Sequence, residues 1–250
     1  MDIDGTLVEE GRAPSEKVIR AIRKAREQGH LFFLCTGRAQ AFLPDGLRDA
    51  DFLDGFVCGT GTHICFHGKT IFNQHIPREA LRAVCRFYLA QGRACLCEGE
   101  DDVYITPIDG ASTVPPGLIR IDAEDVFETC FAHANITKLT VSSSLTEADR
   151  QLLCPWFTLY DMGHYFEAIL NGNTKATGME KMLAAIGVPR EDSIAIGDNT
   201  NDMSMVEYAG LGVAMGNACD VLKAAADAVT ATCAEDGVAK MIEDYVMTGK

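Results

Sequence analysis

Two acidic clusters stand at opposite ends of this 250-residue chain, at residues 2–5 (DIDG) and residues 197–202 (GDNTND). Side chains two positions apart on an extended chain point to the same side, so Asp2 and Asp4 can converge on one point. Gly5 then lets the backbone turn away. A hard cation such as Mg²⁺ takes carboxylate oxygens and keeps waters and phosphate oxygens as its remaining ligands. If folding joins the two clusters, they predict a metal-assisted phosphoryl-transfer site.

Two other elements have the chemistry to hold a phosphate group. Thr36 and Gly37 follow the apolar run 31–35, and a hydroxyl with backbone N–H groups at such a strand end can bind phosphate oxygens. Lys175 adds a mobile positive charge for the same anion. Taken singly, each element is more typical of ordinary structure, such as a solvated turn or a surface lysine. Their occurrence together, in this order, favours the catalytic interpretation.

In combination, the four elements resemble the motifs of the haloacid dehalogenase superfamily, in its Cof-like branch of type IIB capped phosphatases. The resemblance covers nearly the whole chain and includes the identities of the residues as well as their spacing. The segments that carry it are residues 2–6 (DIDGT), 36–38 (TGR), Lys175, 193–216 (SIAIGDNTNDM onward to GVAMG) and 235–239 (EDGVA).

The resemblance implies a phosphatase mechanism with two catalytic carboxylates. Asp2 would be the nucleophile that attacks phosphorus and forms an aspartyl phosphate, which water then hydrolyses. Asp4 would protonate the leaving oxygen and later take a proton from the attacking water. The substrate would be a small phosphorylated metabolite, with phosphorylated sugars foremost.

The resemblance also implies ligands for Mg²⁺ and for the phosphate group. The metal would be held by the side chain of Asp2, the backbone carbonyl of Asp4 and the side chain of Asp198. Asp202 would lie outside these direct ligands and orient the metal's waters or Lys175. The groups implied to hold the phosphate oxygens are Thr36, the N–H of Gly37, Lys175 and Asn201.

The elements that must position these residues alternate between helix and strand in residues 1–75 and again in residues 171–250. Such alternation favours an α/β fold with a parallel sheet, and the site would lie at the carboxyl ends of its strands. The resemblance implies a Rossmann-like core domain made of both segments. The predicted elements are helix 15–28, strand 31–35, helix 38–47, strand 55–58, helix 176–186, strand 193–197, helix 201–209, strand 211–215, helix 217–226 and helix 237–247.

Residues 76–170 interrupt this alternation with a different pattern, αββαβαββ. Such an order predicts an independent α+β unit, and the resemblance implies that it is the type IIB cap domain, which would select the substrate. The predicted elements are helix 78–91, strands 94–98 and 102–108, helix 123–134, strand 136–142, helix 146–154, and strands 157–161 and 165–170.

Composition excludes several classes of protein. With 36 acidic and 22 basic residues the net charge is −14, which opposes nonspecific binding to nucleic acid or to an anionic membrane. No stretch approaches the roughly 20 apolar residues that span a bilayer, and the start lacks the pattern of a signal peptide. The ten cysteines lie mostly in apolar segments, as reduced and buried thiols do. A cytoplasmic protein is expected.

Two features depart from the family's pattern. Residues 60–62 read Thr-Gly-Thr where the family usually has Asn-Gly-Ala. Met1 directly precedes Asp2, whereas the family's nucleophile ends a buried strand of about five to seven residues. Without such a strand, strands 31–35 and 193–197 would keep unpaired backbone groups. We therefore expect the natural protein to have residues upstream of Met1; otherwise its α-amino group would lie near the metal site.

Three alternatives compete with hydrolysis. A phosphosugar mutase would share the aspartyl phosphate but pass the phosphoryl group to a sugar hydroxyl. A non-catalytic protein would bind a phosphometabolite without turnover, if the short start is native. A dinucleotide-binding interpretation fails, because Gly59-x-Gly61 and Gly210-x-Gly212 lack the third glycine in register and the following acidic residue.

Overall fold

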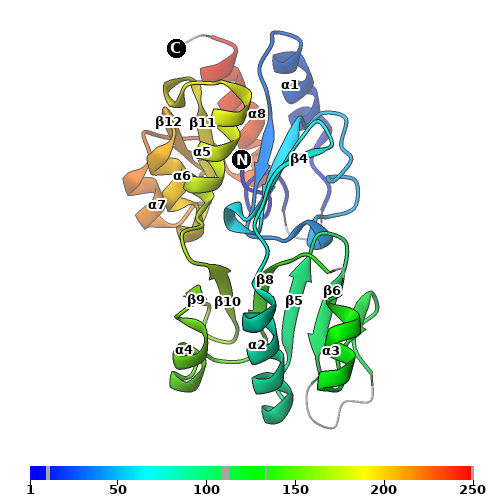
Figure 1. Cartoon of the computed structure of the whole chain (residues 1–250). Coiled ribbons are helices and arrows are strands. Elements are labelled where there is room, and N and C mark those ends of the chain that lie inside the picture. Colours follow the sequence, from blue (N-terminus) through cyan, green and yellow to red (C-terminus); the bar gives the residue numbers. More distant parts are fainter. Residues whose placement is uncertain (10–11, 108–112, 133, 249–250) are drawn as a thin grey trace. The chain divides into compact units, whose positions relative to one another are not determined.

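The computed structural model describes residues 1–9, 12–107, 113–132 and 134–248. The chain divides into two compact units, named unit 1 and unit 2 (Figure 1). Unit 1 consists of Met1–Gly37, Pro44–Phe72 and Thr174–Lys250, and unit 2 of Arg38–Leu43 and Asn73–Asn173. Position 108 of the predicted strand 102–108 and position 133 of the predicted helix 123–134 lie outside the described residues.

Unit 1 alternates strands with helices, as the sequence pattern predicts. Its strands are β1 (Phe33–Cys35), β2 (Gly55–Cys58), β3 (His63–Phe66), β4 (Lys69–Asn73), β11 (Ile194–Gly197), β12 (Leu211–Ala214) and β13 (Ala228–Val229). Its helices are α1 (Glu16–Arg26), α5 (Lys175–Ile186), α6 (Met203–Tyr208), α7 (Asp220–Ala225) and α8 (Gly237–Met241), the last followed by a π-helical turn at Ile242–Val246.

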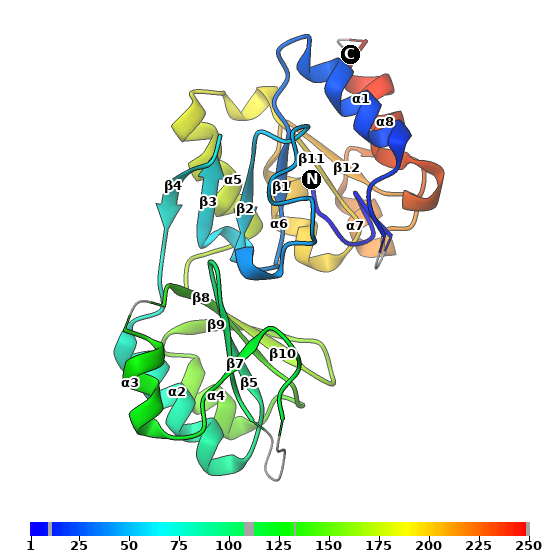
Figure 2. The same ribbon diagram turned by 90° about the vertical axis from the view of Figure 1, so that its right-hand side faces the viewer.

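The strands of unit 1 form two sheets rather than one. One has the order β1-β2-β3-β4 and the other β11-β12-β13. β1 pairs with β2 in parallel, and so do β11 with β12 and β12 with β13, whereas β2 and β3 are antiparallel. Helix α5 packs against β1, β2 and β3, and α6 packs against β11 and β12 (Figure 2). The expected α/β fold with parallel pairing in the core is confirmed.

Two expectations about residues 1–75 need correction. The helix predicted at 38–47 is a 3-10 turn at Gln40–Phe42, because Pro44 follows and Gly46 adopts a positive φ of 83° that ends any helix. The hairpin of β3 and β4 was not expected. It turns at His67 and Gly68, both with positive φ, and β4 carries the mixed sequence KTIFN, which has little strand periodicity.

Unit 2 contains one continuous six-stranded sheet in the order β7-β6-β5-β8-β10-β9. Its strand pairs are antiparallel except β6 with β7. The strands are β5 (Cys95–Gly99), β6 (Val103–Thr106), β7 (Leu118–Arg120), β8 (Ile136–Val141), β9 (Phe157–Asp161) and β10 (Phe166–Leu170), and the helices are α2 (Arg78–Gln91), α3 (Glu124–Cys130) and α4 (Glu147–Leu153).

The core of unit 2 forms where its helices cover one face of the sheet (Figure 2). Tyr88 of α2, Leu139 of β8, Leu153 of α4 and Phe166 of β10 are all fully buried there. The added strand β7 makes the observed order αβββαβαββ, one strand more than the sequence pattern predicts. Among the described residues, no helix is both long and apolar enough to cross a membrane.

Candidate active site

Asp2 lies between the two sheets of unit 1. Its N–H donates a hydrogen bond to the carbonyl of Ile196 in β11 (3.0 Å). On the other side, the carbonyl of Met1 accepts from the N–H of Cys35 (2.7 Å), and the α-amino group of Met1 donates to the carbonyl of Phe33 in β1 (2.9 Å). The first two residues thereby hold the Asp2 side chain at the carboxyl ends of β1 and β11, where ligands of parallel sheets bind.

Lys175 joins Asp2 to the second acidic cluster. Its ammonium donates to Oδ1 of Asp2 (2.8 Å) and to Oδ1 of Asp202 (2.5 Å). Both Lys175 and Asp202 are fully buried. Lys175 is the first residue of α5, a helix whose N-cap Thr174 accepts from the N–H of Thr177, so the backbone that carries the lysine is well defined. Three residues that are far apart in sequence therefore form one buried ionic cluster.

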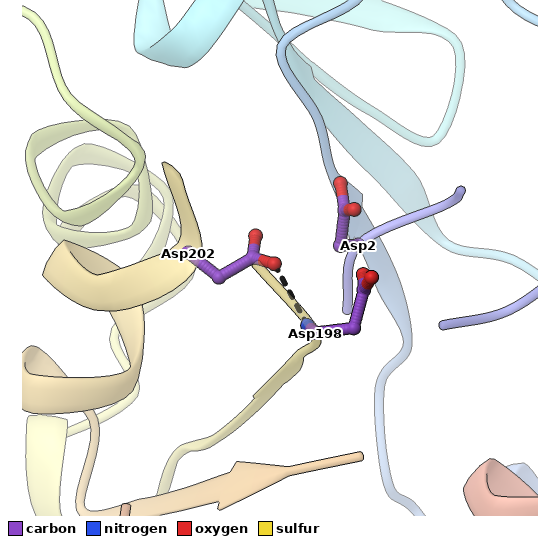
Figure 3. Close-up of side chains that lie close together, drawn as sticks. All are labelled: Asp2, Asp198 and Asp202. Atoms are coloured by element: carbon purple, nitrogen blue, oxygen red, sulfur yellow. Dashed lines mark hydrogen bonds between the residues drawn. The ribbon is translucent and has the colours of Figure 1, made fainter. Parts of the chain in front are cut away.

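Asp198 completes a set of three carboxylates. It follows β11 directly, and oxygens of Asp2, Asp198 and Asp202 lie within 4.8 Å of one another (Figure 3). Thr6 donates from its hydroxyl to Oδ1 of Asp198 (3.0 Å). Gly5 has a φ of 79°, and a Cβ there would lie 2.4 Å from Asp198 Oδ2, so this close approach requires glycine.

Asp202 is held on both of its oxygens. Its Oδ1 accepts from Lys175, and its Oδ2 accepts from the N–H of Asp198 (2.9 Å, dashed in Figure 3) and from the N–H of Asn199 (3.0 Å). A Cβ at Gly197 would lie 2.4 Å from Cγ of Asp202. Because the protein uses both oxygens, Asp202 is better placed to orient Lys175 and the Asp198 loop than to bind a metal directly.

The site shifts the pKa of several groups. Burial alone would lower the pKa of Lys175, but the carboxylates of Asp2 and Asp202 raise it above its usual value. Burial raises the pKa of Asp2, with Asp202 adding to the effect and Lys175 opposing it. Burial, with repulsion from Asp202 and Asp2, raises the pKa of Asp198 to about 6. Clustered carboxylates around one buried cation are typical of functional sites.

The chemistry of the cluster fits a hard divalent cation. The donors are carboxylate oxygens alone, which Mg²⁺ prefers over softer ligands. Asp2 and Asp198 approach each other from different segments, and burial together with repulsion from neighbouring carboxylates raises the pKa of each, so a cation between them would stabilise their charged forms. The Asp4 carboxylate is not part of this set of three; Asp4 is half-buried, and its backbone bridges to Val8.

The expected phosphate ligands lie on three segments. Thr36 is buried at the end of β1, where its N–H donates to the carbonyl of Val57 (2.9 Å) and its carbonyl accepts from Thr60 (3.1 Å). Gly37 follows it. Lys175 belongs to the ionic cluster, whereas Asn201 is exposed in the 3-10 turn Thr200–Asp202. Thr36 and Lys175 are therefore buried in unit 1, whereas Asn201 is exposed at its surface.

Sequence reasoning gave no role to two residues that shape the site. Thr6 holds Asp198 and could have been found, because it lies in the same short segment as Asp2 and Asp4. Asn217 donates from Nδ2 to the carbonyl of Gly5 (2.8 Å) and accepts from the N–H of Cys233. Nothing in the local sequence around Asn217 signals this role, since its partners are distant in the chain.

The α-amino group of Met1 is buried close to these charges. Burial lowers its pKa, while Asp2 and Asp202 oppose the shift and Lys175 adds to it.

Comparison with known proteins agrees with the geometry. The family of haloacid dehalogenase-like hydrolases matches residues 1–242. The 5-amino-6-(5-phospho-D-ribitylamino)uracil phosphatase YitU of Bacillus subtilis is 28% identical over 98% of this chain and 96% of its own length. The pyridoxal phosphate phosphatase YbhA of Escherichia coli is 26% identical over 99% and 97%.

A solved structure extends the match to the fold. The sugar phosphatase BT4131, of subclass IIB of the same superfamily, superposes with a TM-score of 0.80 at 26% identity, covering 98% of this chain and 96% of its own. Both the carboxylate cluster and these similarities point to phosphate-ester chemistry. The chain therefore belongs to the haloacid dehalogenase-like hydrolases and is a phosphoric monoester hydrolase of that family.

Proposed function

We propose that this protein is a cytoplasmic, Mg²⁺-dependent phosphatase that hydrolyses small phosphorylated metabolites, foremost sugar phosphates, through an aspartyl phosphate on Asp2. The observation that carries the proposal is the cluster in which Lys175 bonds Asp2 and Asp202 while Asp198 lies beside them. It combines a nucleophile, a fixed positive charge and an additional carboxylate at the carboxyl ends of parallel strands.

Asp2 would attack phosphorus, forming a bond from its carboxylate oxygen as the bond to the leaving oxygen breaks. Mg²⁺, held by the side chains of Asp2 and Asp198 and the carbonyl of Asp4, would supply positive charge that offsets the repulsion between carboxylate and phosphate. Lys175 stays protonated because its neighbours raise its pKa, and it can stabilise negative charge on the transferring group. Thr36, the N–H of Gly37 and Asn201 are proposed to bind the phosphate oxygens.

Asp4 is proposed as the acid and base of the two steps. It would give a proton to the leaving oxygen and take one from the water that hydrolyses the aspartyl phosphate. The backbone of Asp4 bridges to Val8, which fixes the turn that starts two residues after Asp2. A carboxyl outside the buried cluster suits this exchange, since it has to gain and lose a proton.

The substrate class rests on the relatives. YitU, YbhA and BT4131 are named for a phosphorylated ribitylaminouracil, pyridoxal phosphate and sugar phosphates, which share a phosphate monoester on a small polar molecule. We also propose that residues 76–170 form a cap domain on a core made of residues 1–75 and 171–250, and that this cap selects the leaving group. The bounds of unit 2 support this division.

Phosphate release from a panel of phosphate esters, with Mg²⁺ and with excess chelator, tests the proposal. Asp2→Asn should lower kcat by about 10⁴-fold or more, because the nucleophile is lost. Asp45→Asn, an exposed aspartate of unit 1, is the matched control and should leave kcat unchanged. A phosphorylated sugar isomer as product would indicate a mutase instead, and tight binding without turnover by the folded protein would indicate a binding protein.

The cap assignment has its own test. Lys138 is buried on β8 and pairs with Glu167 of β10 (2.6 Å), so it is a charged group in an otherwise well-packed sheet. Lys138→Met should reorder the kcat/KM values among the esters of the panel, whereas the exposed Arg150→Met should not. An unchanged order in both variants would argue against a selecting role for this part of unit 2.

A further inference from the structure

Residues 216–219, in the turn after β12, contact both acidic segments of the candidate site. The N–H of Cys219 donates a hydrogen bond to the carbonyl of Asp198 (3.0 Å). Two residues earlier, Asn217 donates from Nδ2 to the carbonyl of Gly5 (2.8 Å). One short turn therefore connects the two segments that supply the candidate metal ligands, although they lie at opposite ends of the chain.

The side-chain amide of Asn217 is fixed in one orientation by its two partners. Its Oδ1 accepts from the N–H of Cys233 (2.8 Å), while its Nδ2 donates to Gly5. Turning the amide over would set donor against donor at one partner and acceptor against acceptor at the other. The N–H of Cys233 is itself well placed, because it begins a 3-10 turn that has a capping box of Thr232 and Glu235. The donor of Asn217 is therefore directed at Gly5.

The bond to Gly5 fixes a peptide unit next to a candidate metal ligand. The N–H of Gly5 donates to the carbonyl of Val8 (2.8 Å). In a planar trans peptide the N–H and C=O point in opposite directions, so the carbonyl of Asp4, in the same peptide unit, points away from Val8. The next peptide unit is held through the Gly5 carbonyl by Asn217, and it leads to Thr6, whose hydroxyl donates to the second acidic segment. Both peptide units that flank Gly5 thus have a fixed direction.

We propose that Asn217 is a positioning residue for Mg²⁺ binding, which holds the turn at Gly5 so that the carbonyl of Asp4 and the carboxylate of Asp198 keep a fixed relative position. The inference rests on the proposed Mg²⁺ site. Mg²⁺ requires near-octahedral geometry, so small displacements of its ligands lower the affinity. A Cβ at Gly5 would lie 2.4 Å from Oδ2 of Asp198, so a shift of one segment is transmitted to the other. Asn217 itself is exposed, so its loss should change global stability little.

Calorimetric titration of Mg²⁺ into the substrate-free protein tests this with a readout other than activity. At about pH 8, where the carboxylates are charged, Asn217→Leu should raise the Kd for Mg²⁺ about tenfold, because it removes both hydrogen bonds at similar volume. Asn135→Leu, at an exposed position of unit 2, is the control and should leave the Kd unchanged. An equal Kd for wild type and Asn217→Leu would overturn the inference alone. Absence of Mg²⁺ binding by the wild type would overturn the proposed function and the inference with it.

A second variant leaves Asn217 in place and removes only its anchor. Cys233 is the first residue of its 3-10 turn, a position that tolerates proline, and the extended conformation of Thr232 before it is compatible with proline. Cys233→Pro, which lacks the N–H, should raise the Kd for Mg²⁺ about threefold, whereas Cys233→Ala, which keeps it, should not. In the Asn217→Leu background the proline should have no further effect. An equal effect of the proline in both backgrounds would show that it does not act through Asn217 and would overturn the inference.

Discussion

The sheet of unit 2 is continuous, whereas that of unit 1 is divided. Six strands of unit 2 pair one after another, and helices α2, α3 and α4 cover one face with a shared apolar core. In unit 1 a four-stranded and a three-stranded sheet have their edge strands β1 and β11 on either side of Met1 and Asp2, whose backbone groups hydrogen bond to both. Asp2, the proposed nucleophile, is thus placed by a few backbone hydrogen bonds between the two sheets.

The two units also use buried charge differently. In unit 2, Asp149 accepts from the Tyr88 hydroxyl (2.7 Å), from Arg93 (2.9 Å) and from the N–H of Thr146 (2.9 Å), so its charge is matched by donors around it. In unit 1, one cation, Lys175, is shared by two carboxylates, those of Asp2 and Asp202, and the pKa values of Asp2 and Asp198 are raised. The charge of Asp149 in unit 2 is matched by donors, which favours stability, whereas the acidic cluster of unit 1 has an excess of negative charge that a bound cation could neutralise.

Among the variants that compare the two units, the largest effect on stability is expected from removing the shared cation. Lys175→Met should lower kcat by at least about 10²-fold and destabilise unit 1 by about 3–5 kcal/mol, because Asp2 and Asp202 would stay buried without a counter-charge. Hydrogen exchange should speed up in unit 1 and stay unchanged in unit 2. Lys24→Met, on the exposed face of α1, is the control and should shift stability by less than about 0.5 kcal/mol. Faster exchange in both units would break the distinction drawn between them.

A smaller and purely structural effect is expected in unit 2. Asp149→Asn should cost about 3 kcal/mol, because Arg93 and Tyr88 lose a charged acceptor. Denaturant unfolding measures the loss, and kcat per folded molecule should not change. Glu147→Gln, exposed on the same helix, is the control.

The stability difference between the wild type and Asp149→Asn should depend on pH, because the pKa of Asp149 is shifted. Burial alone would raise this pKa, but hydrogen bonds from Arg93, Thr146 and Tyr88 lower it below its usual value. A lowered carboxyl pKa contributes stability above the unfolded value of about 3.9 and loses it as pH falls through the folded value. The gap between wild type and Asp149→Asn should therefore be constant near neutral pH and shrink below about pH 4.

The pH dependence of Mg²⁺ binding tests whether the excess negative charge of unit 1 serves to bind a cation. Protons compete with a cation for Asp198, whose pKa is about 6 without metal. Mg²⁺ affinity should therefore be nearly constant above that pH and fall up to about tenfold for each pH unit below it. Calorimetry at several pH values measures this, and Asp198→Asn should remove the dependence. Affinity that is flat down to about pH 5 would contradict the assignment of Asp198 as a ligand.

The smallest effect concerns Thr60, which has a φ of 56° in the left-handed region. Asn adopts this conformation more readily than a β-branched residue, so Thr60→Asn should stabilise unit 1 by about 0.5–1 kcal/mol. Thr62→Asn, at a right-handed position, should give no gain. Thermal unfolding of both variants is the measurement, and equal shifts would show that backbone strain at Thr60 is not the reason.

Much of the fold could be predicted from local sequence, because capping residues and apolar runs determine many of its helices and strands. Helix α2 spans Arg78–Gln91 as predicted, because Pro77 begins it and Gly92 ends it in a left-handed conformation. The apolar runs at β11 and β12 predict buried parallel strands for a similar reason. By contrast, β7 and the hairpin of β3 and β4 were missed, since their short mixed sequences acquire strand structure only by pairing with neighbours.

Burial of charge was the part that local sequence could not predict. An acidic stretch at residues 98–102 is typical of a solvated turn, and Asp101 and Asp102 are indeed exposed. Glu98, however, is 3% exposed, and its carboxylate accepts from the hydroxyl of Thr140 on the neighbouring strand β8. Its pKa is raised by burial, with Lys138 opposing the shift. Whether a carboxylate is solvated depends on which strand pairs beside it.

The amino-acid sequence by itself determined the residue types of the site and the order of the elements that carry them. Hydrophobic periodicity and motif spacing are local properties, and they predicted an α/β fold with a metal-assisted phosphoryl-transfer site, while the resemblance to the haloacid dehalogenase superfamily implied a phosphatase. The tertiary structure decided that Lys175 is a buried counter-ion rather than a surface lysine, and that the sheet of unit 1 is divided beside Asp2. Both depend on contacts between segments distant in the chain, because solvation and strand pairing are set by spatial neighbours.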